Sequence, residues 1–467
     1  ELDHPTPFEH GNSYTVHLVR GKQNLAKAMA ALPLLETALA TPMEYLVLER
    51  HPDHPRDPSR LRLQEVTRSP IEKTVLFDRP RHEDGRILLG PHADGCGEAF
   101  LRLYTDNSMW STSLTGGTGI GKSIGIGTVA ISALDMRNTG QHTVLFYMDG
   151  QNGASSPALF QHATWPVGTD RALRMLSALE RIADWRQKEN RANGWSGFTP
   201  GEDRPGILVI IDEAHLILPL APLRFANAAK AWRKLGISFF VADQDSSLKT
   251  FGGEDSLRAA LLGGNGLVMN VSSRIAGNLI SGLDINPFDL PRIPGYAVLV
   301  AAAGSGGRTA PFRFRYAPDG TYRAKAEAVG ETLTVPTIED WFRRYPPLEL
   351  DKGARRAAGR DYTQRHVIAE QEREDLLAFI SADDGDEVGD VDAVEVVGDP
   401  GAVGSTCAQR ILGLDWAAYG EMERAQIFGE LPDVDASTAT KALAALVGSG
   451  DLVRVGRGKY RRRAGGE

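Results

Sequence analysis

The chain has 467 residues, 42% of them hydrophobic, which is enough for about two or three domains with sizeable cores. Its formal net charge of −8 excludes a globally basic nucleic-acid-binding protein, so any nucleic-acid contact must come from local patches. The two cysteines, Cys96 and Cys407, lie far apart and are expected to be unpaired thiols. No window has the apolar length that spans a bilayer.

Residues 1–80 predict a small α/β unit. Strands are expected over residues 14–19 and 44–50, and a helix over residues 24–40, where leucines recur at helical spacing. This unit is expected to act as a structural spacer or as a subunit contact.

A glycine-rich stretch follows, after two expected strands at residues 86–89 and 98–104. It joins an expected strand at residues 109–114 to an expected helix at residues 123–135, and it fits the phosphate-loop pattern G-x-x-x-x-G-K-[ST]. In such a loop the backbone N–H groups meet phosphate oxygens, the lysine reaches the β and γ phosphates, and the final hydroxyl holds Mg²⁺. The predicted nucleotide-binding residues are Gly116, Gly117, Thr118, Gly119, Ile120, Gly121, Lys122 and Ser123.

An apolar strand is expected at residues 142–148, and it ends at Asp149. Two interpretations of Asp149 are open, a functional group at the carboxyl edge of a sheet or a turn cap. Residues 170–191 predict a long amphipathic helix whose apolar face packs on the core.

The second strong motif is the apolar run at residues 207–211, followed by Asp212 and Glu213. Such a run is typical of a buried parallel strand. Asp212 is predicted to hold Mg²⁺, and Glu213 to polarise the attacking water as general base. Acid pairs are common at strand ends, but together with the phosphate loop this one favours hydrolysis.

Two later strands also end in polar residues. The expected strand at residues 237–242 leads to Gln244, a candidate sensor of the γ phosphate, although a simple polar turn has the same pattern. The expected strand at residues 267–271 leads to Ser272, Ser273 and Arg274. The last strands are expected at residues 297–302 and 311–316, so residues 81–320 predict a parallel α/β sheet domain.

Residues 321–402 predict exit helices and an acidic, flexible linker. Residues 403–467 predict a winged helix, with helices at residues 406–412, 422–428 and 436–447 and a hairpin at residues 452–455 and 458–462. Basic residues on the wing favour DNA binding over the alternative of protein contacts. The predicted DNA-binding residues are Ser437, Thr438, Thr440, Lys441, Arg454, Arg457 and Lys459.

The chain resembles the FtsK/SpoIIIE DNA translocases of the FtsK–HerA superfamily over about residues 85–320. Four stretches carry the resemblance in the family's order: residues 114–123, Asp212-Glu213, residues 234–244 and residues 271–275. With the unit in front and the winged helix behind, the chain is similar to TraB-type plasmid transfer proteins of mycelial actinobacteria. Arg274 stands where the family usually has lysine.

The resemblance implies a RecA-like P-loop NTPase core and a homo-hexamer with ATP between subunits. It also implies an arginine that acts across the subunit interface, with Arg274 as first candidate and Arg258 as second. The catalytic set is then Glu213, Lys122, Gln244 and Arg274, with ATP and Mg²⁺ bound and Ser123 and Asp212 as metal ligands.

The function expected from these features is ATP-driven movement of double-stranded plasmid DNA in conjugation. Chromosome segregation, protein secretion by an ATPase of the same superfamily, and nucleotide-switched DNA regulation are the alternatives. The expected location is the cytoplasmic face of the membrane, and the missing initial methionine is compatible with a membrane anchor upstream.

Overall fold

The computed structural model describes residues 2–280, 283, 286–300, 308, 310–320, 322–323, 335–367 and 370, and further on only residues 422–423, 427, 443, 446, 452–456 and 459–462. The chain divides into two compact units, Glu1–Leu376 and Leu377–Glu467. Among the described residues, no helix combines the length and the apolar composition that a bilayer crossing requires.

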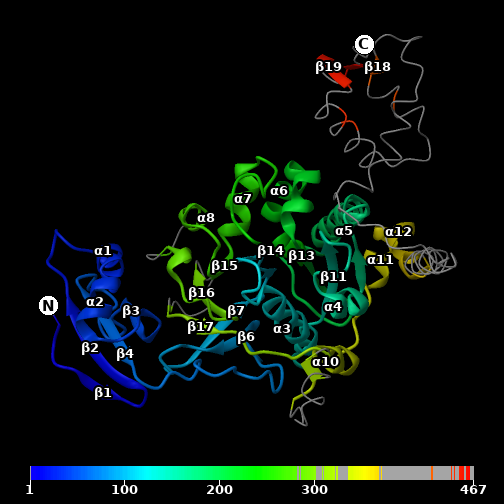
Figure 1. Ribbon diagram of the computed structural model, residues 1–467. Coiled ribbons are helices and arrows are strands. Elements are labelled where there is room, and N and C mark those ends of the chain that lie inside the picture. The colour runs from blue at the N-terminus through cyan, green and yellow to red at the C-terminus, as the bar shows by residue number, and fades with distance from the viewer. Residues whose placement is uncertain are drawn as a thin grey trace, which may run out of the picture. The chain divides into compact units, whose positions relative to one another are not determined.

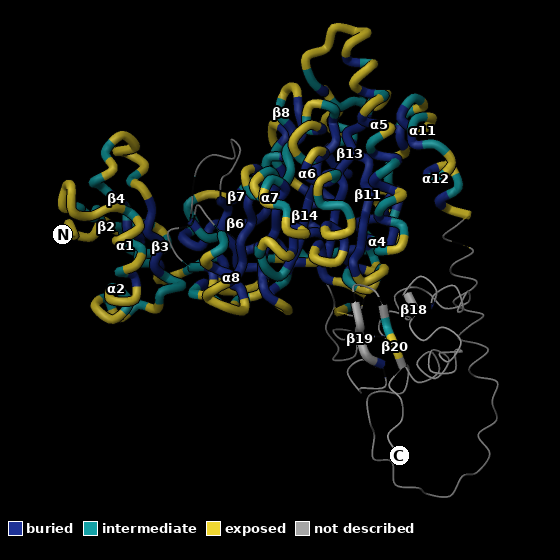
Figure 2. The backbone as a smooth tube through the Cα atoms, turned by 90° about the horizontal axis from the view of Figure 1, so that it is seen from above, coloured by how far each residue is buried: buried dark blue, intermediate teal, exposed yellow. Residues whose placement is uncertain are grey.

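The central element of the first unit is an eight-stranded sheet with the order β12-β11-β13-β14-β10-β15-β16-β17 (Figure 1). Apolar runs form β11 and its neighbours β13 and β14, which are buried along their whole lengths (Figure 2). The bounds are β10 Thr112–Thr115, β11 Thr143–Asp149, β12 Trp165–Val167, β13 Gly206–Asp212, β14 Ile237–Asp243, β15 Asn265–Met269, β16 Tyr296–Val300 and β17 Phe312–Arg313.

Helices cover both faces of this sheet, because alternate side chains of each strand enter two different cores. On β11, Leu145 and Tyr147 join one core, whereas Val144 and Phe146 join the other. The first core is closed by α3 Lys122–Asp135, α4 Pro157–His162 and α10 Ile338–Arg344. The second is closed by α5 Ala172–Asn193, α6 Pro222–Ala231, α7 Asp255–Leu262, α11 Lys352–Ala358 and α12 Arg360–Thr363.

The expectation of a wholly parallel sheet is wrong at one edge. The six strands β12, β11, β13, β14, β10 and β15 are parallel to their neighbours. However, β16 pairs antiparallel with β15, and β17 pairs antiparallel with β16. Met269 lies opposite Ala297, so the chain leaves β15 and re-enters β16 at the same edge. The intervening helices, α8 Arg274–Asn278 and η6 Pro287–Asp289, therefore stay at the carboxyl edge of the parallel strands and make no crossover.

The strand expected at residues 109–114 is also shorter than predicted. Met109 ends a separate hairpin, β8 Tyr104–Thr105 with β9 Ser108–Met109, and β10 begins only at Thr112. The strands just before it form a small antiparallel sheet of β5 His82–Glu83, β6 Arg86–Pro91 and β7 Glu98–Arg102.

The N-terminal unit, residues 6–66, is a four-stranded antiparallel sheet with the order β1-β2-β4-β3. The strands are β1 Thr6–Phe8, β2 Gly11–His17, β3 Leu46–Arg50 and β4 Arg60–Val66, and η1 Met43–Tyr45 precedes β3. The single helix expected at residues 24–40 is two helices, α1 Leu25–Ala30 and α2 Leu32–Leu39. Pro33 stands in the first turn of α2, where its missing N–H is tolerated, whereas a continuous helix would need that donor.

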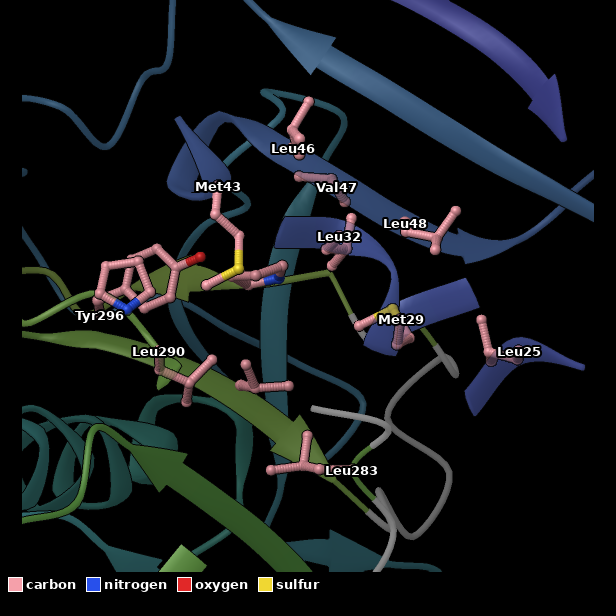
Figure 3. Close-up of a pocket in the computed structure, with 13 residues that line it drawn as sticks. Leu25, Met29, Leu32, Met43, Leu46, Val47, Leu48, Leu283, Leu290 and Tyr296 are labelled. Carbon is pink, nitrogen blue, oxygen red and sulfur yellow. The ribbon is translucent and has the colours of Figure 1, made fainter. Parts of the chain in front are cut away.

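The N-terminal unit shares a core with the sheet domain. Figure 3 shows apolar residues of the unit facing Leu283, Leu290 and Tyr296 of the sheet domain around one pocket. Val47 and Val66 also pack in one cluster with Val298 and Val300 of β16.

A buried ionic cluster joins the same two parts. The Arg308 guanidinium donates to Glu49 at 2.9 Å and 3.2 Å, and it also donates to Asp94. Glu49 is only 5% exposed and Asp94 is fully buried. Burial alone would raise the pKa of Asp94, but the hydrogen bonds and charge of Arg308 outweigh it and hold that pKa below its usual value.

We expect Arg308→Ala to destabilise the first unit by about 3–5 kcal/mol, because it leaves the buried Asp94 without its cation and leaves Glu49 paired with Arg62 alone. Since the pKa of Asp94 is lowered by folding, this stabilisation is present above its unfolded pKa of 3.8 and is lost as pH falls further through the lower folded pKa. Thermal unfolding measured from pH 7 down to well below pH 3.8 checks both points. Arg20→Ala, whose partner Asp57 lies 3.8 Å away at an exposed site, is the control and should cost under about 1 kcal/mol.

The described part of the second unit contains a three-stranded antiparallel sheet with the order β18-β20-β19. The predicted hairpin is present as β19 Leu452–Gly456 and β20 Lys459–Arg462. Met422–Glu423 forms β18, so the start of the helix expected at residues 422–428 is wrong. Leu443 and Leu446, within the range of the helix expected at residues 436–447, are buried.

Candidate nucleotide-hydrolysis site

The glycine-rich loop is anchored at the carboxyl edge of three neighbouring strands. The Gly116 N–H donates to the Asp243 carbonyl at 3.1 Å, and the Gly117 N–H donates to the Asn270 carbonyl at 2.8 Å. Gly119 and Gly121 have φ values of +75° and +98°, in the left-handed region that side chains disfavour. The loop therefore has the strand–loop–helix context that a phosphate loop requires.

Lys122 begins α3 and its side chain folds back over the loop. Its Nζ donates to the carbonyls of Gly116 at 2.9 Å and Gly117 at 3.2 Å, and the residue is buried. An ammonium held across the loop lies where it can meet phosphate oxygens, which would compete for the same donors. Ser123, the next residue, is exposed in the first turn of this 14-residue helix.

Asp149 and Asp212 lie opposite each other at the ends of β11 and β13. The Asp149 carboxylate accepts hydrogen bonds from the N–H groups of Gln151, Gly153 and Ser155, at 2.9, 2.7 and 3.1 Å. It also accepts one from the Ser155 hydroxyl at 2.6 Å. Of the two interpretations of Asp149, these contacts match the turn cap.

Asp212 is a buried carboxyl group that gains from a nearby cation. Burial raises its pKa to about 7, and the charges of Asp149 and Glu213 act in the same direction, whereas the charge of Lys122 opposes them. A hydroxyl and a carboxylate are suitable Mg²⁺ ligands, and a bound cation would relieve the cost of ionising Asp212. Ser123 and Asp212 therefore fit a magnesium site chemically.

We expect Asp212→Asn to stabilise the protein in magnesium-free buffer at pH 8. The folded-state pKa is above the unfolded value of 3.8, so the stability present below pH 3.8 is lost as pH rises towards 7. Removing the ionisation should return on the order of 1–4 kcal/mol at pH 8 and clearly less at pH 5. Thermal unfolding across this range tests it, with exposed Asp203→Asn as control, and a gain that does not change with pH would contradict it.

Glu213 follows Asp212 and has a positive φ of 47°, which is uncommon for a residue with a side chain. Its Oε2 accepts a hydrogen bond from the Gln244 Nε2 at 3.2 Å. The Gln244 Oε1 in turn accepts one from the Thr118 hydroxyl of the loop, also at 3.2 Å. Thr118, Gln244 and Glu213 thus form one hydrogen-bonded chain from the phosphate loop to the acid.

Two further residues belong to this site and were not predicted. The His215 Nδ1 lies 3.1 Å from Asp243 Oδ1 and 3.5 Å from Glu213 Oε2. Burial raises the pKa of Asp243. In the sequence, only the position of His215, two residues after Glu213, could have indicated that it belongs to the site. Asp243 gave no such indication, because it is 28 residues away from His215.

Arg274 and Arg258 have partners within the chain. The Arg274 guanidinium forms a bidentate salt bridge with Asp289 and lies 5.4 Å from the centre of the Phe288 ring. The Arg258 Nη2 donates to the Leu279 carbonyl at 2.6 Å. For Arg274 to reach another subunit, its pair with Asp289 would have to open.

The predicted DNA-binding side chains lie outside what the structure describes. Only the backbones of Arg454 and Lys459 are placed, on β19 and β20 of the hairpin. Those left out are Ser437, Thr438, Thr440, Lys441 and Arg457.

Comparison with known proteins finds similarity to solved structures only. No family model and no curated protein matches the chain. It is similar to the pCW3 conjugation coupling protein TcpA in its monomer form with ATPγS, at 16% identity and a TM-score of 0.44, over 68% of this chain and 88% of that one. It is also similar to the cytoplasmic domain of the type VII secretion ATPase EccC of Thermomonospora curvata, at 17% identity and a TM-score of 0.44.

The EccC match covers 59% of this chain and 33% of that one. A third similar structure is the bacterial conjugative coupling protein TrwB, at 13% identity and a TM-score of 0.27, over 46% of this chain and 91% of that one.

Proposed function

We propose that this chain is an ATP-hydrolysing motor that moves double-stranded DNA. The observation that carries the hydrolytic part is the hydrogen-bonded chain from Thr118 through Gln244 to Glu213. It connects a loop suited to phosphates with a buried carboxylate suited to take a proton from water. A nucleotide-binding switch would need the loop but not this acid.

Each residue then has a definite task. Lys122 and the loop amides bind the phosphates, while Ser123 and Asp212 hold Mg²⁺. When bound, Mg²⁺ neutralises charge on the β and γ phosphates. Glu213 accepts the proton of the attacking water, and Gln244 orients Glu213 and senses whether a γ phosphate is present.

DNA is proposed as the cargo on the evidence of the sequence. Basic residues gather on the wing of the predicted winged helix, although the chain as a whole carries a net charge of −8. We propose that this module reads a short duplex sequence, while the sheet domain acts in a hexamer that contacts phosphates without sequence preference. Plasmid transfer at the membrane is the process that the resemblance to TraB-type proteins favours.

ATP turnover with and without duplex DNA tests the proposal, together with the size of the assembled complex. DNA should stimulate hydrolysis by the full chain, and removal of residues 400–467 should abolish preference for a selected sequence while leaving non-specific binding. An equal rate of ATP hydrolysis with and without duplex DNA would refute the proposal of a DNA motor. Stimulation by a secreted protein would favour the secretion alternative, a cargo class that the comparison with a type VII secretion ATPase also raises.

Arg274 is proposed to complete the site of a neighbouring subunit, with Arg258 as second candidate. Subunits carrying Arg274→Ala mixed with subunits carrying Glu213→Gln should regain some hydrolysis if the arginine acts across the interface. Undiminished hydrolysis by an assembly carrying only Arg274→Ala would eliminate that residue.

A further inference from the structure

We propose that Glu213, His215 and Asp243 form a binding site for a divalent transition metal of the Zn²⁺ type, next to the magnesium site assigned to Ser123 and Asp212. One ligand atom from each of the three residues lies within 4.8 Å of the others. Two of the separations are 3.1 Å, from His215 Nδ1 to Asp243 Oδ1, and 3.5 Å, from His215 Nδ1 to Glu213 Oε2.

These two separations are close to what a tetrahedral zinc ion requires. Zinc binds imidazole nitrogen and carboxylate oxygen at about 2.0–2.2 Å, so two of its ligands lie about 3.3–3.6 Å apart. A bound ion would hold Asp243 Oδ1 slightly farther from His215 Nδ1 than the present 3.1 Å, and its fourth position would stay open for water. One imidazole with two carboxylates suits zinc, whereas magnesium prefers oxygen ligands alone.

The backbone holds the three ligands in place. The left-handed turn at Glu213 directs the chain so that the His215 N–H donates to Asp243 Oδ2 at 2.6 Å. Asp243 Oδ1 also accepts from the Gln244 N–H. Outer hydrogen bonds of this kind orient metal ligands and sharpen affinity.

An ion can reach the site from solvent. His215 and Asp243 line an open cleft together with Gln244, Lys249 and Thr250. The His215 side chain is 40% exposed, whereas the side chains of Glu213 and Asp243 are buried and only 11% and 7% exposed. The metal would therefore enter on the histidine side, and the two buried carboxylates would complete its protein ligands.

The expected effect of zinc on ATP hydrolysis rests on the proposed function of Glu213. A cation on Glu213 Oε2 makes the carboxylate a weaker base towards the proton of water, and it competes with the Gln244 N–H for the same oxygen. Zinc should therefore inhibit hydrolysis while ATP still binds to the loop, which has separate residues.

Metal titration of the full chain tests the site without any activity assay. The metal-free protein is titrated with Co²⁺, whose absorption reports a tetrahedral site, and with Zn²⁺ by calorimetry. We expect one saturable site, and at least about tenfold weaker binding in His215→Ala and in His215→Gln. The control is His54→Ala, which removes a histidine from the exposed end of the His51–His54 pair.

Thermal unfolding shows whether each variant is folded, and His215→Gln serves if His215→Ala is not. Unchanged metal affinity in a folded His215 variant, or no saturable binding by the natural chain, would overturn the site. A chain that binds zinc through His215 but never hydrolyses ATP would leave the site standing and would refute the proposed function instead.

Discussion

Glu213→Gln is expected to hydrolyse ATP about 10²–10⁴ times more slowly than the natural chain, with nucleotide affinity nearly unchanged. Glutamine keeps the shape and can still accept from the Gln244 amide, but it cannot take a proton from water. ATP should therefore bind and persist on the variant. Turnover rates and the binding of a fluorescent ATP analogue measure the two effects separately.

Glu202→Gln is the matched control, because Glu202 is exposed and far along the chain from the loop. It should leave both turnover and binding unchanged. Ordinary turnover by Glu213→Gln would refute the assignment of Glu213 as general base, and loss of nucleotide binding would show that the carboxylate supports the loop instead.

Lys122→Ala is expected to weaken nucleotide binding about 10- to 150-fold, because hydrogen bonds to charged groups contribute about 1.5–3 kcal/mol. The ammonium also holds the loop through the Gly116 and Gly117 carbonyls, so its loss should loosen the loop as well. The dissociation constant for ATP measures the first effect, and thermal unfolding without nucleotide measures the second.

Lys249→Ala is the control for general charge loss, since Lys249 lines the neighbouring cleft and not the loop. It should change the dissociation constant by less than about twofold. An unchanged dissociation constant in Lys122→Ala would mean that the glycine-rich stretch binds no nucleotide, whatever its spacing. The two variants thus separate nucleotide binding, which depends on Lys122, from hydrolysis, which depends on Glu213.

Some of the site could be read from neighbouring residues. Gly116 to Ser123 is a local pattern, because the backbone geometry of a phosphate loop depends on residues within one turn of it. The run at residues 207–211 likewise predicted a buried strand with Asp212 at its end, and β13 has that strand and that end. Local patterns also indicated the alternation of strands and helices along most of the sheet domain.

Other features depend on which distant strands become neighbours. The order β13-β14-β10 places Gln244 between the acid of one strand and the loop of another. Thr118 and Gln244 are 126 residues apart, and Gln244 and Glu213 are 31 apart, so no local spacing encodes their contacts. His215 and Asp243 meet for the same reason, and their proximity was not predicted.

The tertiary structure likewise shows two features that were not predicted: the antiparallel edge at β16 and the break between α1 and α2. Strand propensity does not set direction, since both directions use the same extended backbone, and direction follows from where the chain re-enters the sheet. The sequence alone therefore predicted the glycine-rich loop between β10 and α3, the acids Asp212 and Glu213 at the end of β13, and the α/β class. Only the folded chain decided which polar side chains meet at its carboxyl edge, because contacts between distant residues depend on strand order and register.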